Sequence, residues 1–238
     1  MNHTSDRPVL GVVGGLGPLA SAEFLKTIYE CSLAGREQEA PIVMLLSDPT
    51  CPDRTSEFLR HSYDNLLERL IESLNRLRDL RASKVVICCI TYHYLLPRVP
   101  HELRKKVISL LDVIFDRITN VRKKHLLFCT NGTRKMQLFE THERWPTAKE
   151  FFVLPNEEDQ NAIHDLIYGH IKSNKPVHTL RPAFEALMAK YEVDRFVAGC
   201  TEIHLPAKQF EISNGNHQGY SCVDPLTIIA KEIAKGKL

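Results

Sequence analysis

The segment FVAGCTEIH, residues 196–204, places a cysteine directly after a short apolar run and a glycine. An earlier segment, VVICCITYH at residues 85–93, has a similar arrangement, and in each a histidine stands four residues after a cysteine. Further β-branched or apolar runs at residues 9–13, 42–46, 126–129 and 151–154 alternate with stretches whose apolar residues recur every three or four positions. This order predicts parallel sheets covered by helices, with the chemistry at the carboxyl ends of the strands.

The two cysteine segments also indicate an internal repeat. Glycine-containing turns follow two of the expected strands, GGLGP after the first and CTNGT after the fourth. We therefore expect an α/β fold of two similar domains, each a mostly parallel sheet flanked by helices. The active site would lie in the cleft between them, with one cysteine from each domain.

The composition excludes several classes of protein. With 238 residues, 43% of them hydrophobic and 25% charged, the chain is long enough for one large core or two smaller ones. A net charge of +2 with scattered basic residues disfavours a nucleic-acid partner. The sequence starts without a leader pattern and has no run of about 18 apolar residues, so we expect no membrane association and a cytoplasmic location. The seven cysteines lack CxxC spacing, which indicates reduced thiols rather than disulfides or a zinc site.

Two thiols on opposite sides of a cleft suit the inversion of a carbon that carries an acidic proton. One group removes the proton from one face while the other returns a proton to the opposite face, and a thiolate and a thiol can fill these roles. The alternative for any cysteine is a buried side chain that acts as a small hydrophobe. We assign that second role to Cys31, Cys88, Cys129 and Cys222, and expect Cys88 to point away from the face that Cys89 uses.

Several motifs together resemble one family, the cofactor-independent aspartate/glutamate racemases, and most closely its aspartate racemases. The resemblance runs over nearly the whole chain and rests on GVVGGLGPLASAEF, SDPTCPDRT, TNGT, GCTE and CVDP. It implies racemisation of a small acidic amino acid, aspartate, without pyridoxal phosphate or any other cofactor and without a metal. It also implies a homodimer, and a division into one domain of residues 1–103 with 212–238 and a second of residues 104–211.

The resemblance further implies a role for each matching residue. Cys89 and Cys200 would be the acid/base thiols. Arg54 and Lys172 would bind the side-chain carboxylate of the substrate, and Glu202 would bind its ammonium group or orient the neighbouring thiol. The α-carboxylate would be held by Thr91, Thr133, Thr201 and the backbone N–H groups of the Asn131-Gly132-Thr133 turn.

Other interpretations stay open for some of these residues. Arg54 would otherwise be a surface residue, Lys172 a solvated helix-end lysine and Glu202 a helix cap. His93 and His204 either polarise the thiols or pack in the interior. Ile90 stands where the family usually has an asparagine, which removes one polar group from the expected site.

Four alternative functions follow from the same features. The substrate could be glutamate or another acidic amino acid, and a related carbanion enzyme, a decarboxylase or a cis-trans isomerase, would use a similar cleft. The Ile90 departure favours a non-catalytic amino-acid-binding protein. A dinucleotide-binding oxidoreductase is the remaining alternative, because GLGPLA fits G-x-G-x-x-A and Asp48 ends the second strand.

Overall fold

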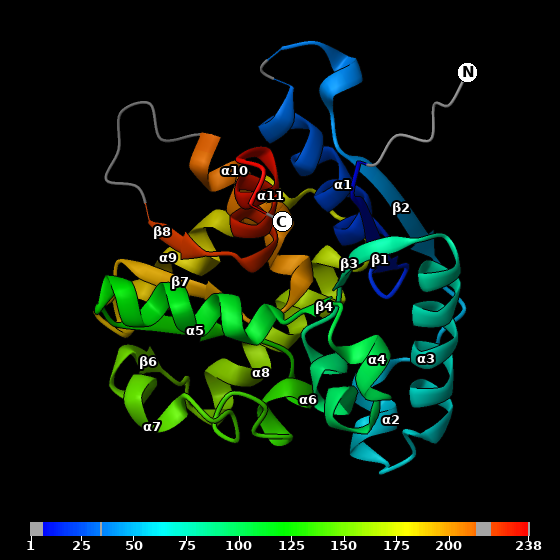
Figure 1. Ribbon diagram of the computed structural model, residues 1–238. Helices are drawn as coiled ribbons and strands as arrows, with labels where there is room; N and C mark the ends of the chain where they lie inside the picture. The colour runs from blue at the N-terminus through cyan, green and yellow to red at the C-terminus, as the bar shows by residue number, and fades with distance from the viewer. Residues whose placement is uncertain (1–6, 34, 213–219, 238) are drawn as a thin grey trace, which may run out of the picture.

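A computed structural model, which describes residues 7–33, 35–212 and 220–237, contains two parallel β-sheets (Figure 1). The strand order is β2-β1-β3-β4 in the first sheet and β6-β5-β7-β8 in the second, and all neighbouring strands are parallel. The strands are β1 (Val9–Gly14), β2 (Ile42–Ser47), β3 (Ala82–Ile87), β4 (Val107–Ile108), β5 (His125–Phe128), β6 (Phe152–Val153), β7 (Arg195–Ala198) and β8 (Ser221–Val223).

The two sheets have the same topology, which confirms the expected fold of two similar α/β halves. In each sheet the first strand in chain order lies between the second and the third, and the fourth lies at the far edge. All the strands expected from the sequence are present, with ends that differ by at most three residues. The short edge strands β4 and β8 were not expected, because two or three residues cannot show a periodic pattern.

Helices connect the strands of both sheets. Within the described residues, none of them is both long and apolar enough to cross a membrane. The α-helices are α1 (Pro18–Ser32), α2 (Arg54–Leu59), α3 (Asp64–Asp79), α4 (His101–Arg104), α5 (Leu110–Val121), α6 (Asn131–Lys135), α7 (Trp145–Ala148), α8 (Glu157–Asp165), α9 (Arg181–Lys190), α10 (His204–Ile212) and α11 (Pro225–Ala234). Shorter 3₁₀ segments include Thr91–Arg98 and Thr201–Ile203, and a π-helical turn spans Leu166–Ile171.

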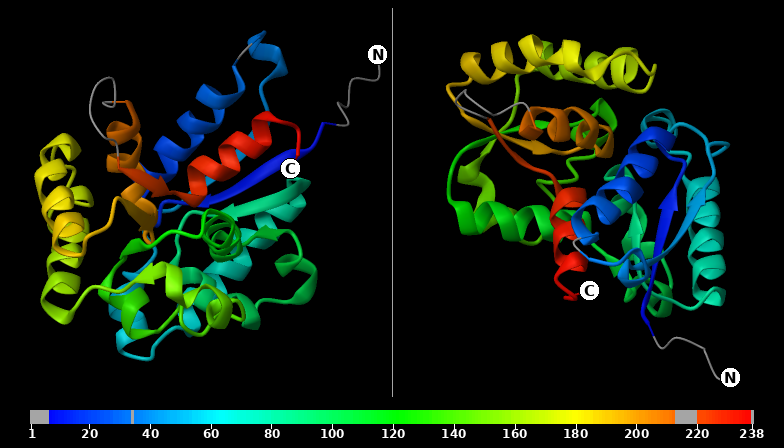
Figure 2. Two further views of the ribbon diagram at one scale, coloured as in Figure 1. Left: turned by 90° about the vertical axis from the view of Figure 1, so that its left-hand side faces the viewer. Right: turned by 90° about the horizontal axis from the view of Figure 1, so that it is seen from above.

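Three apolar clusters hold these layers together. The central cluster packs α1, α5 and α11 against one face of each sheet, and Figure 2 shows α11 running between α1 and α5. A second cluster buries the leucine face of α3 against the outer face of the first sheet, and a third buries α9 and α10 against the second. Cys88 belongs to the central cluster and Cys89 to the second, which confirms that these neighbours point to opposite faces.

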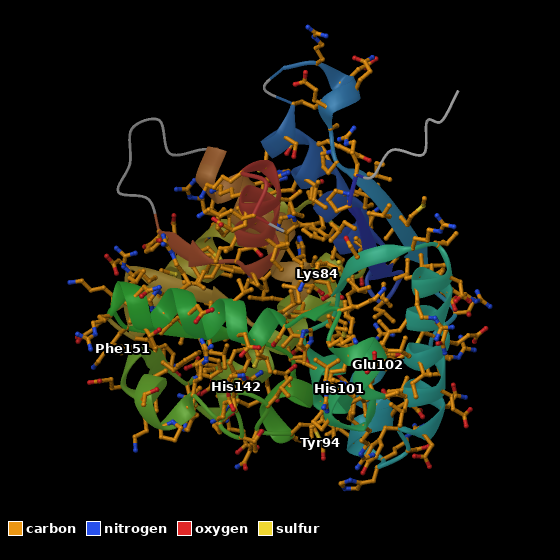
Figure 3. All side chains as sticks on the ribbon, viewed as in Figure 1. Lys84, Tyr94, His101, Glu102, His142 and Phe151 are labelled. Atoms are coloured by element: carbon orange, nitrogen blue, oxygen red, sulfur yellow. The ribbon has the colours of Figure 1, made fainter. Side chains whose placement is uncertain are left out.

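Charged side chains of both signs alternate on the outer helices (Figure 3). Arg76 pairs with Glu72 on α3, and Lys105 pairs with Glu102 after α4. Acids and bases are therefore interleaved at these positions of α3 and α4.

The C-terminal segment contributes to both halves. β8 lies after residue 212 but pairs with β7 of the second sheet, whereas α11 packs on α1 of the first half. Similarly, β4 lies after residue 103 but pairs with β3 of the first sheet. The expected division into residues 1–103 with 212–238 and residues 104–211 therefore stays a prediction. In that division, β4 and β8 would each be assigned to the half whose sheet they do not join.

A buried hydrogen-bond network ties three helices together around His204, at the start of α10. Its Nδ1 lies 2.5 Å from Oδ2 of Asp224, the N-cap of α11, and its Nε2 lies 3.0 Å from the Thr27 hydroxyl on α1. Burial would raise the pKa of the Asp224 carboxyl, but His204 and the Thr227 hydroxyl hold it below its usual range. The CVDP motif thus serves to join the C-terminal helix to both halves.

We predict that Asp224→Asn lowers the free energy of unfolding by about 3 kcal/mol, because it leaves His204 buried without its anionic partner. A carboxylate whose pKa is lowered by folding stabilises above its unfolded pKa and loses this effect as the pH falls through the folded value. The difference between the two proteins, measured by urea unfolding, should therefore shrink below about pH 4. Asp116→Asn, at an exposed ion pair, should change stability by less than about 0.5 kcal/mol, and an equal loss in both variants would contradict this role.

Candidate active site

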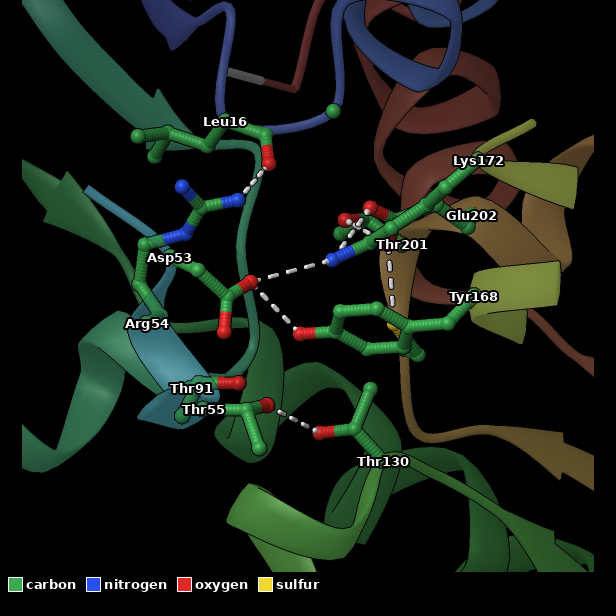
Figure 4. A network of polar contacts seen from close by, with 12 residues as sticks. Leu16, Asp53, Arg54, Thr55, Thr91, Thr130, Tyr168, Lys172, Thr201 and Glu202 are labelled. Atoms are coloured by element: carbon green, nitrogen blue, oxygen red, sulfur yellow. Dashed lines mark hydrogen bonds and ion pairs between the residues drawn. The ribbon is translucent and has the colours of Figure 1, made fainter. Parts of the chain in front are cut away.

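The carboxyl ends of the central strands of both sheets meet in one polar site (Figure 4). After β7, the Thr201 hydroxyl donates to the Cys88 carbonyl oxygen of the other half at 3.2 Å. After β3 and β5, the hydroxyls of Thr91 and Thr133 lie 3.1 Å apart in a hydrogen bond. The two halves are therefore joined by polar contacts at the ends of equivalent strands, where parallel sheets place their ligands.

A cavity of about 340 Å³ opens at this site, between the glycine loop Gly15–Gly17, the segment after β2, and the second half. Three of the expected site residues line it: Arg54, Lys172 and Glu202. Asp53 and Cys51 also line it, so the cavity wall carries two cations, two carboxylates and the Cys51 thiol, whereas Cys89 and Cys200 are not among its lining residues.

Arg54 begins α2 and is 91% buried, with 9% of its surface exposed. Its guanidinium donates to the carbonyl oxygens of Leu16 and Cys51 and, at 2.8 Å, to that of Pro52, which fixes it under the glycine loop. Its Nε is buried and has no hydrogen-bond partner among the described residues. Burial would lower the pKa of Arg54, but nearby Cys89 and Cys51 raise it above its usual value. Arg54 is thus a permanent cation with a donor left for a ligand.

Lys172 follows the π-helical turn and lies among acidic and aromatic groups. Its Nζ is 3.7 Å from Glu202 Oε1, 3.9 Å from Asp53 Oδ2 and 3.8 Å from the centre of the Tyr168 ring. The Tyr168 hydroxyl in turn donates to Asp53 at 2.7 Å. Burial would lower the pKa of Lys172, but Glu202 raises it above its usual value, so the lysine stays charged.

Asp53 has two roles at the junction of the halves. It caps α2 by accepting the Ser56 N–H at 2.8 Å, and it accepts the Tyr168 hydroxyl from the second half. Burial would raise the pKa of the Asp53 carboxyl, but the hydrogen bonds from Ser56 and Tyr168 hold it below its usual range. It is therefore an anion that links the PDRT segment to the second half.

Cys200 is 7% exposed and its thiol donates to Glu202 Oε2 at 2.8 Å. Burial and the Glu202 carboxylate raise the pKa of this thiol well above its usual value, and Lys172 opposes them. The structure thus brings Cys200, Thr201, Glu202 and Lys172 together, as the sequence predicts.

Cys89 is 9% exposed and lies in the range of the same ions. Burial and Glu202 raise the pKa of the Cys89 thiol, whereas Arg54 and Lys172 lower it. Ile90, the departure from the family pattern, does not face the cavity but is 99% buried in the central apolar cluster. Its replacement of a polar residue therefore leaves the charged wall of the cavity in place.

A cluster of threonine hydroxyls lies beside Cys89. Besides the pair formed by Thr91 and Thr133, the Thr130 hydroxyl lies 3.3 Å from that of Thr133 and accepts a bond from Thr55 at 3.5 Å. Thr130 is also the N-cap of α6, where it accepts the Thr133 N–H.

The Asn131 side chain is placed differently from the other expected residues. Its amide donates to Asn161 and its backbone N–H donates to His164, and the residue lines a separate cavity of about 520 Å³. The adjacent Gly132 is needed for close packing, since a Cβ there would lie 2.7 Å from the Thr55 hydroxyl. The turn thus offers the Thr133 hydroxyl to the site, and its role through backbone N–H groups stays a prediction.

Neither histidine of the repeated segments contacts a thiol through a hydrogen bond in the described residues. His93 Nε2 accepts the Leu110 N–H at 2.9 Å, and its Nδ1 lies 3.0 Å from the Cys89 carbonyl oxygen. Burial lowers the pKa of His93 to about 4, so it is neutral and caps α5. Together with the His204 network, this favours the interpretation of both as packing residues.

The glycine loop is shaped to approach other protein groups rather than a dinucleotide. Gly15 has φ of +80°, and a Cβ on Gly17 would lie 2.5 Å from Glu202 Oε1. A carboxylate therefore stands at the N-terminus of α1, where a pyrophosphate would have to bind, and repels such a ligand. Asp48 meanwhile accepts from Thr50 and pairs with Arg69. These contacts disfavour the oxidoreductase alternative.

Sequence reasoning missed Asp53, Thr55, Thr130 and Tyr168 as members of the site. Asp53 and Thr55 flank Arg54 in PDRT, and Tyr168 precedes Lys172 by four residues, the spacing of helical neighbours. These positions in the sequence could have indicated Asp53, Thr55 and Tyr168 as site residues. Within residues 7–33, 35–212 and 220–237, no three metal-ligating side chains are grouped as a metal site would require; the expected absence of a metal stays a prediction.

Several solved structures resemble this protein over nearly its whole length. The Picrophilus torridus aspartate racemase is 19% identical, with a TM-score of 0.79 over 96% of this chain and 94% of that one. An aspartate racemase homologue from Pyrococcus horikoshii OT3 is 18% identical, with a TM-score of 0.66 over 95% and 98%. The Francisella tularensis glutamate racemase, solved with D-glutamate, is 14% identical, with a TM-score of 0.59 over 97% and 80%. These likenesses show a shared two-domain α/β fold.

The Asp/Glu/Hydantoin racemase family model matches residues 13–233, a range that holds both cysteine segments, the PDRT segment and Lys172. Since the match covers nearly the whole chain and both halves of the fold, this protein belongs to the Asp/Glu/hydantoin racemase family.

Proposed function

We propose that this protein is a cofactor-independent amino-acid racemase that interconverts L- and D-aspartate, with Cys89 and Cys200 as its two acid/base groups. The observation that carries the proposal is that the two cysteine segments meet: the Thr201 hydroxyl, next to one thiol, donates to the backbone carbonyl group next to the other at 3.2 Å. Consistent with this, Lys172 lowers and Glu202 raises the pKa of both thiols, although the thiols follow strands of different sheets. A substrate among these ions would have one thiol from each half beside it.

The reaction then needs only proton transfers. A thiolate takes the proton from Cα, so that the C–H bond breaks and an S–H bond forms, and the electron pair spreads onto the α-carboxylate. The opposite thiol gives its proton to the other face of Cα and becomes a thiolate. Hydroxyl donors from Thr91 and Thr133 stabilise the charge that develops on the α-carboxylate.

The cations account for an acidic substrate. Arg54 lines the cavity and has a buried Nε without a partner among the described residues, and Lys172 lies between two carboxylates that a substrate carboxylate can partly replace. Aspartate is the preferred substrate in this proposal. Glutamate is longer by one methylene group, a difference that changes the ratio of kcat/KM values only modestly. The homodimer and the cytoplasmic location also stay predictions.

The first test replaces each thiol. We expect Cys89→Ala and Cys200→Ala to lower the rate of aspartate racemisation at least about 1,000-fold, because each removes one of two obligatory proton carriers. Racemisation is followed by chiral chromatography, and α-proton exchange by NMR in D₂O. Cys31→Ala, at the far end of α1, is the matched control and should keep the wild-type rate. Saturable aspartate binding without exchange in the wild type would instead favour the non-catalytic binding protein.

The second test addresses the side-chain carboxylate. Arg54→Lys keeps the charge but loses the planar fork, and we expect kcat/KM for aspartate to fall about 10- to 100-fold. Arg76→Lys, on the exposed face of α3, is the control for a general effect of the substitution. Equal kcat/KM values for Arg54→Lys and the wild type would show that Arg54 does not bind substrate.

The pH dependence provides a third test. Burial raises the pKa of both thiols, so little thiolate exists near neutral pH. We expect kcat/KM to rise with pH by up to about tenfold per unit between about pH 6 and pH 9. A flat profile over this range, measured at constant ionic strength, would argue against a thiolate as the base.

A further inference from the structure

The two thiols occupy equivalent positions in the two halves but have different partners. Each follows the third strand of its half, and each receives a backbone N–H, from Tyr92 for Cys89 and from Glu202 for Cys200. Their exposed fractions, 9% and 7%, are nearly the same. Burial and the local backbone therefore do not distinguish them, and any difference in protonation must come from the neighbouring side chains.

The Cys200 thiol has a fixed carboxylate as its acceptor. Sγ lies 2.8 Å from Glu202 Oε2, and the Thr201 hydroxyl oxygen lies 3.4 Å from the same carboxylate oxygen. Lys172 holds the other oxygen, and the space beside it is closed by Gly17, where an added Cβ would lie 2.5 Å from Oε1. The carboxylate thus has little room to move away from Sγ.

The Cys89 thiol has no such acceptor among the described residues. The charged side chain that acts on it most strongly is Arg54, which is held in place by the Leu16, Cys51 and Pro52 carbonyl groups. A cation favours a thiolate, whereas an adjacent carboxylate that accepts the S–H favours the thiol. Glu202 and Lys172 act on both sulfurs, but the strongest charged neighbour differs: Arg54 favours the thiolate of Cys89, and Glu202 favours the thiol of Cys200.

We propose that Glu202 keeps Cys200 protonated in the free protein, so that Cys200 rests as the proton donor and Cys89 is the thiol that ionises. This assignment rests on the proposed function only in giving the two thiols catalytic roles. In that reaction Cys89 would take the Cα proton and Cys200 would give its own. The new Cys200 thiolate would face Glu202, and proton exchange with water would restore the resting pair.

The test is the rate at which each thiol is alkylated by iodoacetamide without substrate, since only thiolates react appreciably. Tandem mass spectrometry of the peptides resolves Cys89 from Cys88 and both from Cys200. In the wild type we expect Cys89 to react faster than Cys200 at every pH below the range in which both are ionised. Faster alkylation of Cys200 would overturn the assignment without any variant.

Glu202→Gln removes the charge and nearly keeps the shape of the side chain. A pKa lowered by one unit gives about tenfold more thiolate, and the accompanying loss of nucleophilicity reduces the gain to about threefold. We therefore expect Cys200 to be alkylated at least about threefold faster in Glu202→Gln, with a melting temperature that shows a folded protein. An unchanged or slower rate would mean that Glu202 does not hold the proton on Cys200, or that it acts as a base.

Asp53→Asn is the matched control, because it removes the other carboxylate beside Lys172 without touching Cys200. It should leave the Cys200 rate near that of the wild type, and an increase equal to that of Glu202→Gln would assign the effect to the general charge of the cleft. Since no substrate is present, this result is independent of turnover. A protein that fails to exchange aspartate in D₂O would sink the proposed function and leave the alkylation order as a separate finding.

Discussion

Charge compensation in the cleft between the two halves is the constraint on which the site depends. Arg54 and Glu202 are buried and Lys172 and Asp53 are partly buried, and a buried charge is strongly unfavourable unless it is paired and hydrogen-bonded. Each cation therefore has fixed partners: backbone carbonyl groups hold Arg54, and two carboxylates and an aromatic ring surround Lys172. Because the partners come from both halves, neutralising the cleft also sets how the halves meet.

The repeated topology explains why the two cysteines occupy equivalent positions in the two halves. The same strand order in both sheets brings the third strand of each half to the same kind of position, and each strand ends in a cysteine and a short 3₁₀ segment. The charged side chains beside the two cysteines differ, however. The proposed reaction requires one thiol to be deprotonated while the other is protonated, and we infer that their unequal neighbours supply that difference.

The C-terminal segment joins the two halves of the fold. It adds β8 to the second sheet and then returns as α11 to pack on α1, with His204 and Asp224 buried where the three helices meet. A buried hydrogen bond to a carboxylate tolerates little displacement, since losing it would leave the Asp224 charge uncompensated in an apolar interior. The strand end that carries Cys200 is thus anchored one helical turn beyond the cysteine.

The sequence by itself determined the fold class, the central strands, the leucine face of α3 and the two cysteine segments, because alternation, helical spacing and glycine turns are local patterns. Arg54, Thr201 and Glu202 lie in short motifs that resemble the family, and the same resemblance indicated Lys172. Only the tertiary structure decided that Ile90 is buried in the core, that the Asn131 side chain faces another cavity and that Asp53 and Tyr168 join the site. It likewise decided the partners of each thiol. Those outcomes depend on which side chains the fold brings together, as with Asp53 and Tyr168, 115 residues apart, and the periodicity of a single segment does not contain that information.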